Sequence, residues 1–192
     1  IRDKETAAIA LQAALTGHLV FSTLHTNSSS GVIPRLLDLG AQPVSIGPAL
    51  NLVIAQRLVR KLCEKCKVAK PIGEELKKKI NAFLARLPER VDKKQYEAVV
   101  SVYEKATVVQ GAEPCENCHG TGYRGRSGIY ELLRVDDSFE PLIQKHVGDG
   151  EIKEFSRQQG VVFLQEDGVL RVLAGQTSFE EVENVTGPLK EF

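Results

Sequence analysis

Four cysteines in two Cys-x-x-Cys pairs are the residues of this sequence with the clearest chemistry. The first pair is Cys63 and Cys66, and the second is Cys115 and Cys118. A two-residue gap lets one tight turn direct both sulfurs at the same ion, and structural zinc sites are often closed by four thiolates in a tetrahedron. The two pairs together therefore predict one complete zinc site.

The second pair has other interpretations. Cys115, Cys118 and His119 spell a c-type haem attachment motif, and "CENCHGTG" matches one zinc repeat of a J-domain chaperone. Haem attachment would leave Cys63 and Cys66 without a role and requires export, of which the sequence shows no sign. A chaperone module would repeat the glycines, which "CEKCKVAK" lacks. We favour zinc on all four cysteines, with two unrelated pairs of free thiols as the remaining alternative.

A second group of polar side chains lies in the segment "TGHLVFSTLHTN", residues 16–27, which we call the histidine segment. Its apolar run "LVFSTL" is typical of a buried parallel strand. Thr23 and His25 lie at the carboxyl end of that run, where open α/β sheets bind their ligands. From the residues alone, His18 is interpreted as a structural histidine and Arg2 as a partner in a surface ion pair.

Other elements must position these residues. An alanine-rich N-terminal helix ends at Gly17, and a helix with Ile33, Leu36 and Leu37 ends at Gly40. Residues "GPALNLVIAQRLV" predict a further helix with Pro48 in its first turn, and "SGIYELLRV" predicts a strand. Alternating strands and helices indicate α/β layering.

The 48 residues between the cysteine pairs, 67–114, must form a folded insertion that brings the pairs together. Their sequence "EELKKKINAFLARL" predicts an amphipathic helix with solvated lysines. Its apolar stripe consists of Leu76, Ile80, Phe83, Leu84 and Leu87. Further helices are expected at "PLIQKHV", "EIKEFSRQQ" and "TSFEEVENV", the last with Thr177 and Glu180 in a capping box.

The composition is that of a globular protein, with 42% hydrophobic and 26% charged residues. Lys plus Arg and Asp plus Glu both number 25, so no net field favours nucleic acid or anionic lipid. No run approaches the roughly 18 apolar residues of a membrane span. Because the chain starts at Ile1 and contains no methionine, we expect it to be a piece of a longer protein.

The order of the motifs resembles that of a known family. "IRDKETAAIALQAALTGHLVFSTLHTN", "AQRLVRKLC", the first cysteine pair and "CENCHGTGYRGRSGIYELL" are similar to the C-terminal half of type II secretion and type IV pilus assembly ATPases. The resemblance implies an α/β fold, the C-terminal part of a RecA-like P-loop NTPase core with an inserted zinc-binding lobe and a C-terminal helical subdomain. The implied divisions are the core at 1–62, the tetracysteine insertion at 63–118, a return strand at 119–135 and the helical subdomain at 136–192.

The resemblance also implies a function, that of a homo-hexameric ATPase. Such a protein is cytoplasmic and lies at the periphery of the inner membrane, where it powers secretion or pilus assembly. Its expected partner is a platform protein of that membrane, and no direct contact with nucleic acid is expected. The complete protein would bind ATP and Mg²⁺ besides structural Zn²⁺. The catalytic residues carried over from the histidine box are His25, His18 and Thr23. Arg2 and Asp3 are carried over as nucleotide-binding residues, and Cys63, Cys66, Cys115 and Cys118 as the zinc ligands.

Part of an ATPase active site is missing from these 192 residues. They contain no Gly-Lys pair and hence no phosphate-binding loop, and no apolar strand ends in Asp-Glu to hold magnesium. We therefore expect the chain alone to be inactive. The alternative function is a non-catalytic, zinc-stabilised docking or adaptor module.

Overall fold

The computed structural model describes residues 1–106 and 113–189, which divide into two compact units. Unit 1 consists of Ile1–Ala55 and Glu131–Val161, and unit 2 of Gln56–Tyr130 and Val162–Phe192. The predicted insertion at 63–118 and helical subdomain at 136–192 both include residues outside the described ranges. The domain division inferred from the resemblance remains a prediction.

Unit 1 is mainly helical. Its helices are α1 (Lys4–Leu15), α2 (Val32–Asp38), α3 (Pro43–Ala49), the 3₁₀ turn η1 (Asp137–Phe139), α6 (Glu140–Gln144) and α7 (Asp149–Gln158). Helix α3 packs against α1 and α6. The core is formed by fully buried side chains that include Ile33, Ile46, Phe139, Ile143 and Ile152.

Unit 2 combines helices with a small sheet. Its elements are β2 (Val68–Pro71), α4 (Glu74–Arg86), α5 (Lys94–Glu97), β3 (Ser101–Glu104), α8 (Leu164–Leu173) and α9 (Phe179–Thr186). Strands β2 and β3 are antiparallel, with Val68 opposite Glu104 and Pro71 opposite Ser101. Helix α8 packs on α9 and contacts β3.

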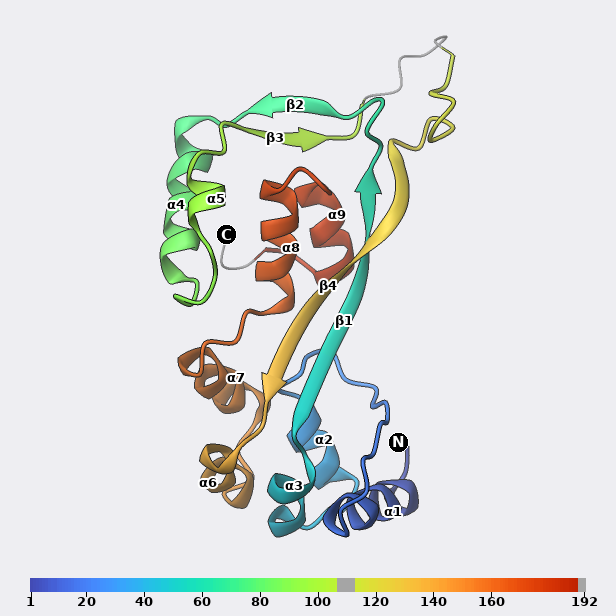
Figure 1. Ribbon diagram of the computed structural model, residues 1–192, viewed down its shortest axis with the longest axis vertical. Coiled ribbons are helices and arrows are strands. Elements are labelled where there is room, and N and C mark those ends of the chain that lie inside the picture. Colours follow the sequence, from blue (N-terminus) through green and yellow to red (C-terminus); the bar gives the residue numbers. More distant parts are fainter. Residues whose placement is uncertain (107–112, 190–192) are drawn as a thin grey trace. The chain divides into compact units, whose positions relative to one another are not determined.

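Two long strands, β1 (Leu52–Leu62) and β4 (Tyr123–Arg134), pair in a two-stranded sheet. They run in opposite directions (Figure 1). The N–H of Val135 donates to the carbonyl of Asn51 (3.0 Å), and the N–H of Cys63 donates to the carbonyl of Gly122 (2.9 Å). Each strand contributes residues to both units.

Among the helices of the described ranges, none has both the length and the apolar character that a membrane span requires.

Several sequence predictions are confirmed. Helix α1 ends before Gly17 (φ 91°), and α2 before Gly40 (φ 84°), each in the left-handed conformation that glycine adopts without strain. Helix α4 buries Ile80, Phe83 and Leu84 as expected from the apolar stripe, with its three lysines exposed. Strand β4 includes the predicted "SGIYELLRV" strand apart from its last residue.

The predicted helix through residues 47–59 is wrong. Helix α3 ends at Ala49, with Pro48 near its end rather than in its first turn, and β1 begins at Leu52. The β-branched residues of this stretch favour a strand, and burial alternates from Val53 (8% exposed) to Ile54 (56% exposed). A short apolar run of this kind fits either element by pattern alone.

The predicted buried strand at 19–24 is also wrong. Residues 18–26 have no regular secondary structure, and Leu19 and Phe21 are 82% and 88% exposed. A strand requires a partner for its backbone hydrogen bonds, and among the described residues no strand pairs with this segment.

The cap of the last helix lies one residue later than predicted. Ser178, not Thr177, is the N-cap of α9, and its Oγ accepts from the N–H of Glu181 at 3.2 Å. Thr177 instead donates its hydroxyl to the carbonyl of Arg60 at 2.8 Å. Tertiary contact with β1 thus decides which hydroxyl caps the helix.

Candidate functional site

The two cysteine pairs meet in one cluster within unit 2. The Sγ atoms of Cys63 and Cys115 are 3.9 Å apart, and those of Cys66 and Cys118 are 3.6 Å apart. All four sulfurs lie within 4.8 Å of one another. In a tetrahedral site with Zn–S bonds of about 2.3 Å, neighbouring sulfurs lie about 3.8 Å apart. The four sulfurs are therefore positioned to bind one metal ion.

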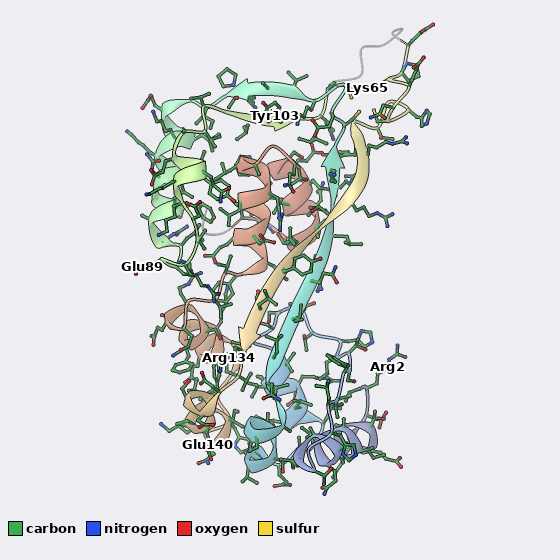
Figure 2. The ribbon with its side chains drawn as sticks, in the orientation of Figure 1. Arg2, Lys65, Glu89, Tyr103, Arg134 and Glu140 are labelled. Atoms are coloured by element: carbon green, nitrogen blue, oxygen red, sulfur yellow. The ribbon has the colours of Figure 1, made fainter. Side chains whose placement is uncertain are left out.

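The first cysteine turn, residues 63–67, follows directly from β1. The carbonyl of Cys63 accepts from the N–H groups of Cys66 (3.2 Å) and Lys67 (2.9 Å), which closes a tight turn around the two thiols. Lys65 lies within this turn (Figure 2). Cys63 is buried and Cys66 is half-buried, so the turn directs both sulfurs toward the protein.

The second cysteine turn, residues 115–122, leads into β4. The carbonyl of Cys115 accepts from Cys118 (3.3 Å) and His119 (2.7 Å). His119, Gly120 and Gly122 all have positive φ, at 52°, 78° and 74°. This left-handed path turns the chain back onto the end of β1, where Gly122 accepts from the N–H of Cys63.

A side-chain amide lies beside the cluster. The Nδ2 of Asn117 donates to the Sγ of Cys63 at 3.0 Å, and this hydrogen bond lowers the pKa of Cys63 to about 6. Burial instead raises the pKa of Cys66 to about 12. Four adjacent thiolates repel one another, so a cation is needed to keep all of them ionised. The donor set of sulfurs fits a soft or borderline ion such as zinc.

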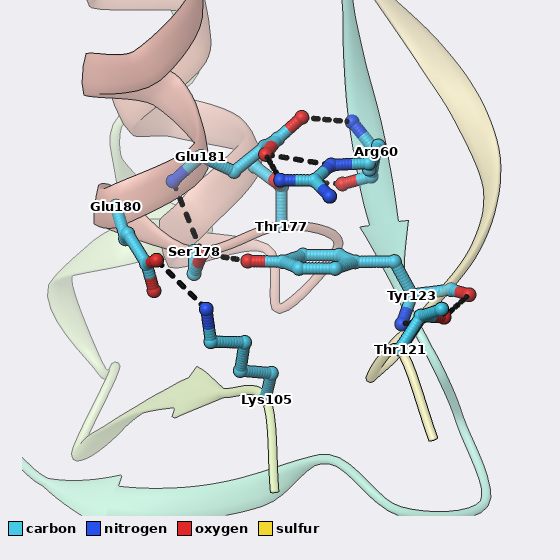
Figure 3. A network of polar contacts seen from close by, with 8 residues as sticks. All are labelled: Arg60, Lys105, Thr121, Tyr123, Thr177, Ser178, Glu180 and Glu181. Carbon is cyan, nitrogen blue, oxygen red and sulfur yellow. Dashed lines mark hydrogen bonds and ion pairs between the residues drawn. The ribbon is translucent and has the colours of Figure 1, made fainter. Parts of the chain in front are cut away.

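A polar network joins the chain beside the cysteine cluster to α9 (Figure 3). Arg60, three residues before Cys63, binds the buried carboxylate of Glu181 through its Nε (2.9 Å) and its own backbone N–H (2.9 Å). Tyr123, five residues after Cys118, shares a hydrogen bond with the hydroxyl of Ser178 at 3.0 Å. The chain on either side of the cluster is thus attached to the start of one helix.

The histidine segment belongs to unit 1, where it runs back along α1. The nitrogen of Ile1 donates to the carbonyl of Thr23 at 2.6 Å, and Arg2 Nε donates to His25 Nε2 at 3.3 Å. Arg2 is labelled in Figure 2. The structure therefore brings three of the predicted site residues together, namely Arg2, Thr23 and His25. All three are exposed.

His18 and Asp3 lie at opposite ends of α1. The Nδ1 of His18 is 3.1 Å from the hydroxyl of Thr16, and His18 lines a shallow hollow beside α1. The Oδ1 of Asp3 accepts from the N–H of Thr6 at 2.8 Å and caps the helix, and the hydrogen bonds from Thr6 lower the pKa of Asp3. Twelve helical residues separate the ends by about 18 Å, so these two side chains do not meet.

Sequence reasoning missed one group near this site. Glu131 of β4 is buried, and its Oε1 accepts from the N–H (3.0 Å) and the hydroxyl (2.5 Å) of Ser29. In the sequence, the only signal is that this glutamate falls at a position of the strand that should face the core. A search for alternating apolar residues reads a charged residue there as a break in the strand pattern. Ser29 follows His25 by four residues, so this contact fixes the turn beyond the histidine segment.

Residues 1–184 match the model of a protein family described as type II/IV secretion system protein. The chain is 44% identical to the type IV pilus assembly ATPase PilB of Thermus thermophilus over 182 residues, which is 95% of this chain and 19% of that protein. It is 41% identical to the type II secretion system protein E of Aeromonas hydrophila over 186 residues, or 97% of this chain and 33% of that protein.

A further relative is the type II secretion system protein E of Pseudomonas aeruginosa, which is 42% identical over 187 residues. These residues are 97% of this chain and 33% of that protein. The chain thus spans about a fifth to a third of the length of the curated relatives it matches.

Proposed function

Because the chain belongs to the family of type II/IV secretion system proteins, we propose that it is the C-terminal part of a hexameric ATPase that powers type II protein secretion or type IV pilus assembly. The observation that carries this proposal is the family match over residues 1–184, which includes both the histidine segment and the cysteine cluster. A docking adaptor would need only the cluster.

We further propose that Cys63, Cys66, Cys115 and Cys118 bind a structural zinc ion. The sulfur separations and the burial of Cys63 and Cys118 support a closed site. When bound, the ion would crosslink the two cysteine turns. With four protein ligands it would hold no reactive water. Asn117 stabilises the thiolate of Cys63 by its hydrogen bond.

The proposed nucleotide-facing residues are those of unit 1. His25 and Thr23 would stabilise charge that develops on the transferred phosphoryl group, because preorganised donors act most strongly there. Arg2 contacts the His25 ring, because its Nε donates a long hydrogen bond of 3.3 Å to Nε2. Asp3 supports this group by capping α1. His18 lies at the other end of the same helix, and its proposed role near the nucleotide is carried over from the histidine box.

The proposal includes the setting of the complete protein. It binds ATP and Mg²⁺ through a RecA-like core that these 192 residues complete, forms a homo-hexamer, and works in the cytoplasm beneath the inner membrane. A platform protein of the secretion or pilus system is its partner. Because no Gly-Lys pair occurs in the chain, the phosphate-binding loop comes from elsewhere in the protein, and the chain alone does not hydrolyse ATP.

The test of the proposed catalytic role is His25→Ala in the full-length protein. Steady-state ATP hydrolysis should fall about 10-fold or more, with the nucleotide Kd changed by less than about threefold, since the contact is strengthened in the transition state. His146→Ala is the matched control, because His146 is also an exposed histidine of unit 1. Equal losses of rate and affinity would remove His25 from the catalytic residues.

Activity of the full-length protein separates the motor from the adaptor. The motor predicts phosphate release with ATP and magnesium by the full-length protein and none by the 192-residue chain. A full-length protein that binds zinc but never turns over ATP would favour the adaptor. Hydrolysis by the purified chain alone would contradict the view that these residues are an incomplete active site.

A further inference from the structure

The turn that follows His25 is held by a charged side chain from a distant part of the sequence. Glu131 lies in β4, 102 residues beyond Ser29, yet both belong to unit 1. Ser29 is 0% exposed and Glu131 is 3% exposed. A buried carboxylate is costly unless donors satisfy it, and here a backbone N–H and a hydroxyl of one residue both donate to the same oxygen.

The turn itself is tightly hydrogen-bonded. The hydroxyl of Thr26 donates to the carbonyl of Ser28 at 2.9 Å, and the hydroxyl of Ser28 accepts from the N–H of Gly31 at 3.2 Å. The carbonyl of Ser29 accepts from the N–H of Val32 at 3.2 Å, at the start of α2. These hydrogen bonds restrain the backbone on both sides of Ser29, so the position of Ser29 affects the path of the chain that leads back to His25.

His25 depends on this backbone for its placement. Its ring is exposed, and Arg2 donates to Nε2 at 3.3 Å. Among the described residues the ring has this one long hydrogen bond, and an exposed ring held in this way is not fixed by packing. Its orientation toward a reacting group must come from the chain on both sides, that is, from the bond between Ile1 and Thr23 and from the turn at Ser29.

We propose that Glu131 is a positioning residue for His25: through its two hydrogen bonds to Ser29, the carboxylate fixes the turn that sets where the histidine ring lies during ATP hydrolysis. The inference rests on the proposed ATPase function. Glu131 touches no substrate in this role and acts through the backbone. Through this contact, a residue of β4 affects the rate of the chemical step.

The experiment compares Glu131→Ala and Glu131→Gln in the full-length protein. Glu131→Ala should lower kcat about 10- to 100-fold, because a small misplacement of a catalytic group has effects of this size. The nucleotide Kd should change by less than about threefold. Glu131→Gln keeps an acceptor oxygen of the same reach, so its loss of kcat should be several times smaller. Ser29→Ala, which keeps the backbone N–H, should also lose less than Glu131→Ala.

The matched control is Glu166→Ala. Glu166 is another buried glutamate, in α8 of unit 2, and its Oε2 accepts from the N–H of Phe163 at 2.9 Å. This control should lower the melting temperature without a selective loss of kcat. If Glu131→Ala fails to fold, Glu131→Gln and Ser29→Ala still carry the test, because both retain part of the contact.

A double-mutant cycle with His25→Ala decides whether Glu131 acts through the histidine. In the double variant, Glu131→Ala should cause no further loss of kcat beyond that of His25→Ala, and hydrogen exchange of residues 26–31 should be faster in Glu131→Ala alone. Multiplicative losses, or a normal kcat in Glu131→Ala, would overturn the inference while the proposed ATPase function stands. Normal turnover in His25→Ala would instead contradict the catalytic role assigned to the histidine segment.

Discussion

The glycines of the second cysteine turn show how backbone geometry limits residue choice. Gly120 and Gly122 both have positive φ, a conformation that costs other residues energy. A β-carbon on Gly122 would also lie 2.6 Å from the β-carbon of Lys105. The glycines of "CENCHGTG" are therefore required by the backbone of the second turn, whereas the first cysteine turn, "CEKCKVAK", closes without glycine.

Gly122→Ala should destabilise unit 2 by about 2–3 kcal/mol, because it combines backbone strain with a steric clash. Gly125→Ala is the matched control, since Gly125 has a φ of 76° but no neighbouring atom within 4 Å of the place that a β-carbon would take. It should cost only the strain, about 1 kcal/mol. Urea denaturation of the zinc-bound chain measures both. Equal costs would show that the contact with Lys105 relaxes easily.

At the scale of elements, α9 is attached to the strand ends that carry the metal ligands. Glu181 is 3% exposed and is bound by Arg60, whose guanidinium also lies 4.3 Å from the centre of the Tyr123 ring. The hydrogen bond to Glu181 raises the pKa of Arg60 further above its already high value. Removal of Arg60 would leave a buried carboxylate with fewer donors, which costs more than the loss of an exposed pair.

Arg60→Ala should therefore lower the free energy of unfolding by about 1–3 kcal/mol. The comparison is Lys70→Ala, which breaks the ion pair between Lys70 and Glu104 in the β2–β3 sheet, where both side chains are more than half exposed. That change should cost at most about 0.5 kcal/mol. Denaturant titrations of both variants at the same salt concentration test the difference, and an equal effect would show that burial of Glu181 contributes nothing.

Local patterns predicted the elements that are stabilised within themselves. Helix α4 follows from the period of Ile80, Phe83 and Leu84, and the four cysteines follow from their spacing. Prediction failed where a distant segment decides the structure. Leu52–Leu62 becomes a strand because β4 pairs with it, and the buried acceptor for Ser29 comes from a residue 102 positions away. The local pattern of Leu52–Leu62 fits either a helix or a strand, and no local pattern identifies Glu131 as the partner of Ser29.

At the scale of the whole molecule, the two candidate sites belong to different units. All four cysteines lie in unit 2, and the histidine segment lies in unit 1. The chain passes from one unit to the other within β1, and again within β4. Because each unit has its own buried core, loss of the metal should first destabilise unit 2, which contains the four cysteines.

Removal of the metal should thus loosen unit 2 selectively. A structural ion contributes folding free energy to the elements it crosslinks, and amide exchange reports such local opening. After chelation under reducing conditions, amides of residues 56–67 and 113–130 should exchange at least about 10-fold faster, whereas those of α2 and α7 should keep their protection. The control is Cys63→Ser together with Cys66→Ser, which should show the faster exchange without chelator and no further change when chelator is added.

Zinc content of the untreated chain should be about one ion per chain. Equal loss of protection in both units would mean that the ion supports the entire fold, and a covalently bound haem or a chain without metal would contradict the zinc site itself.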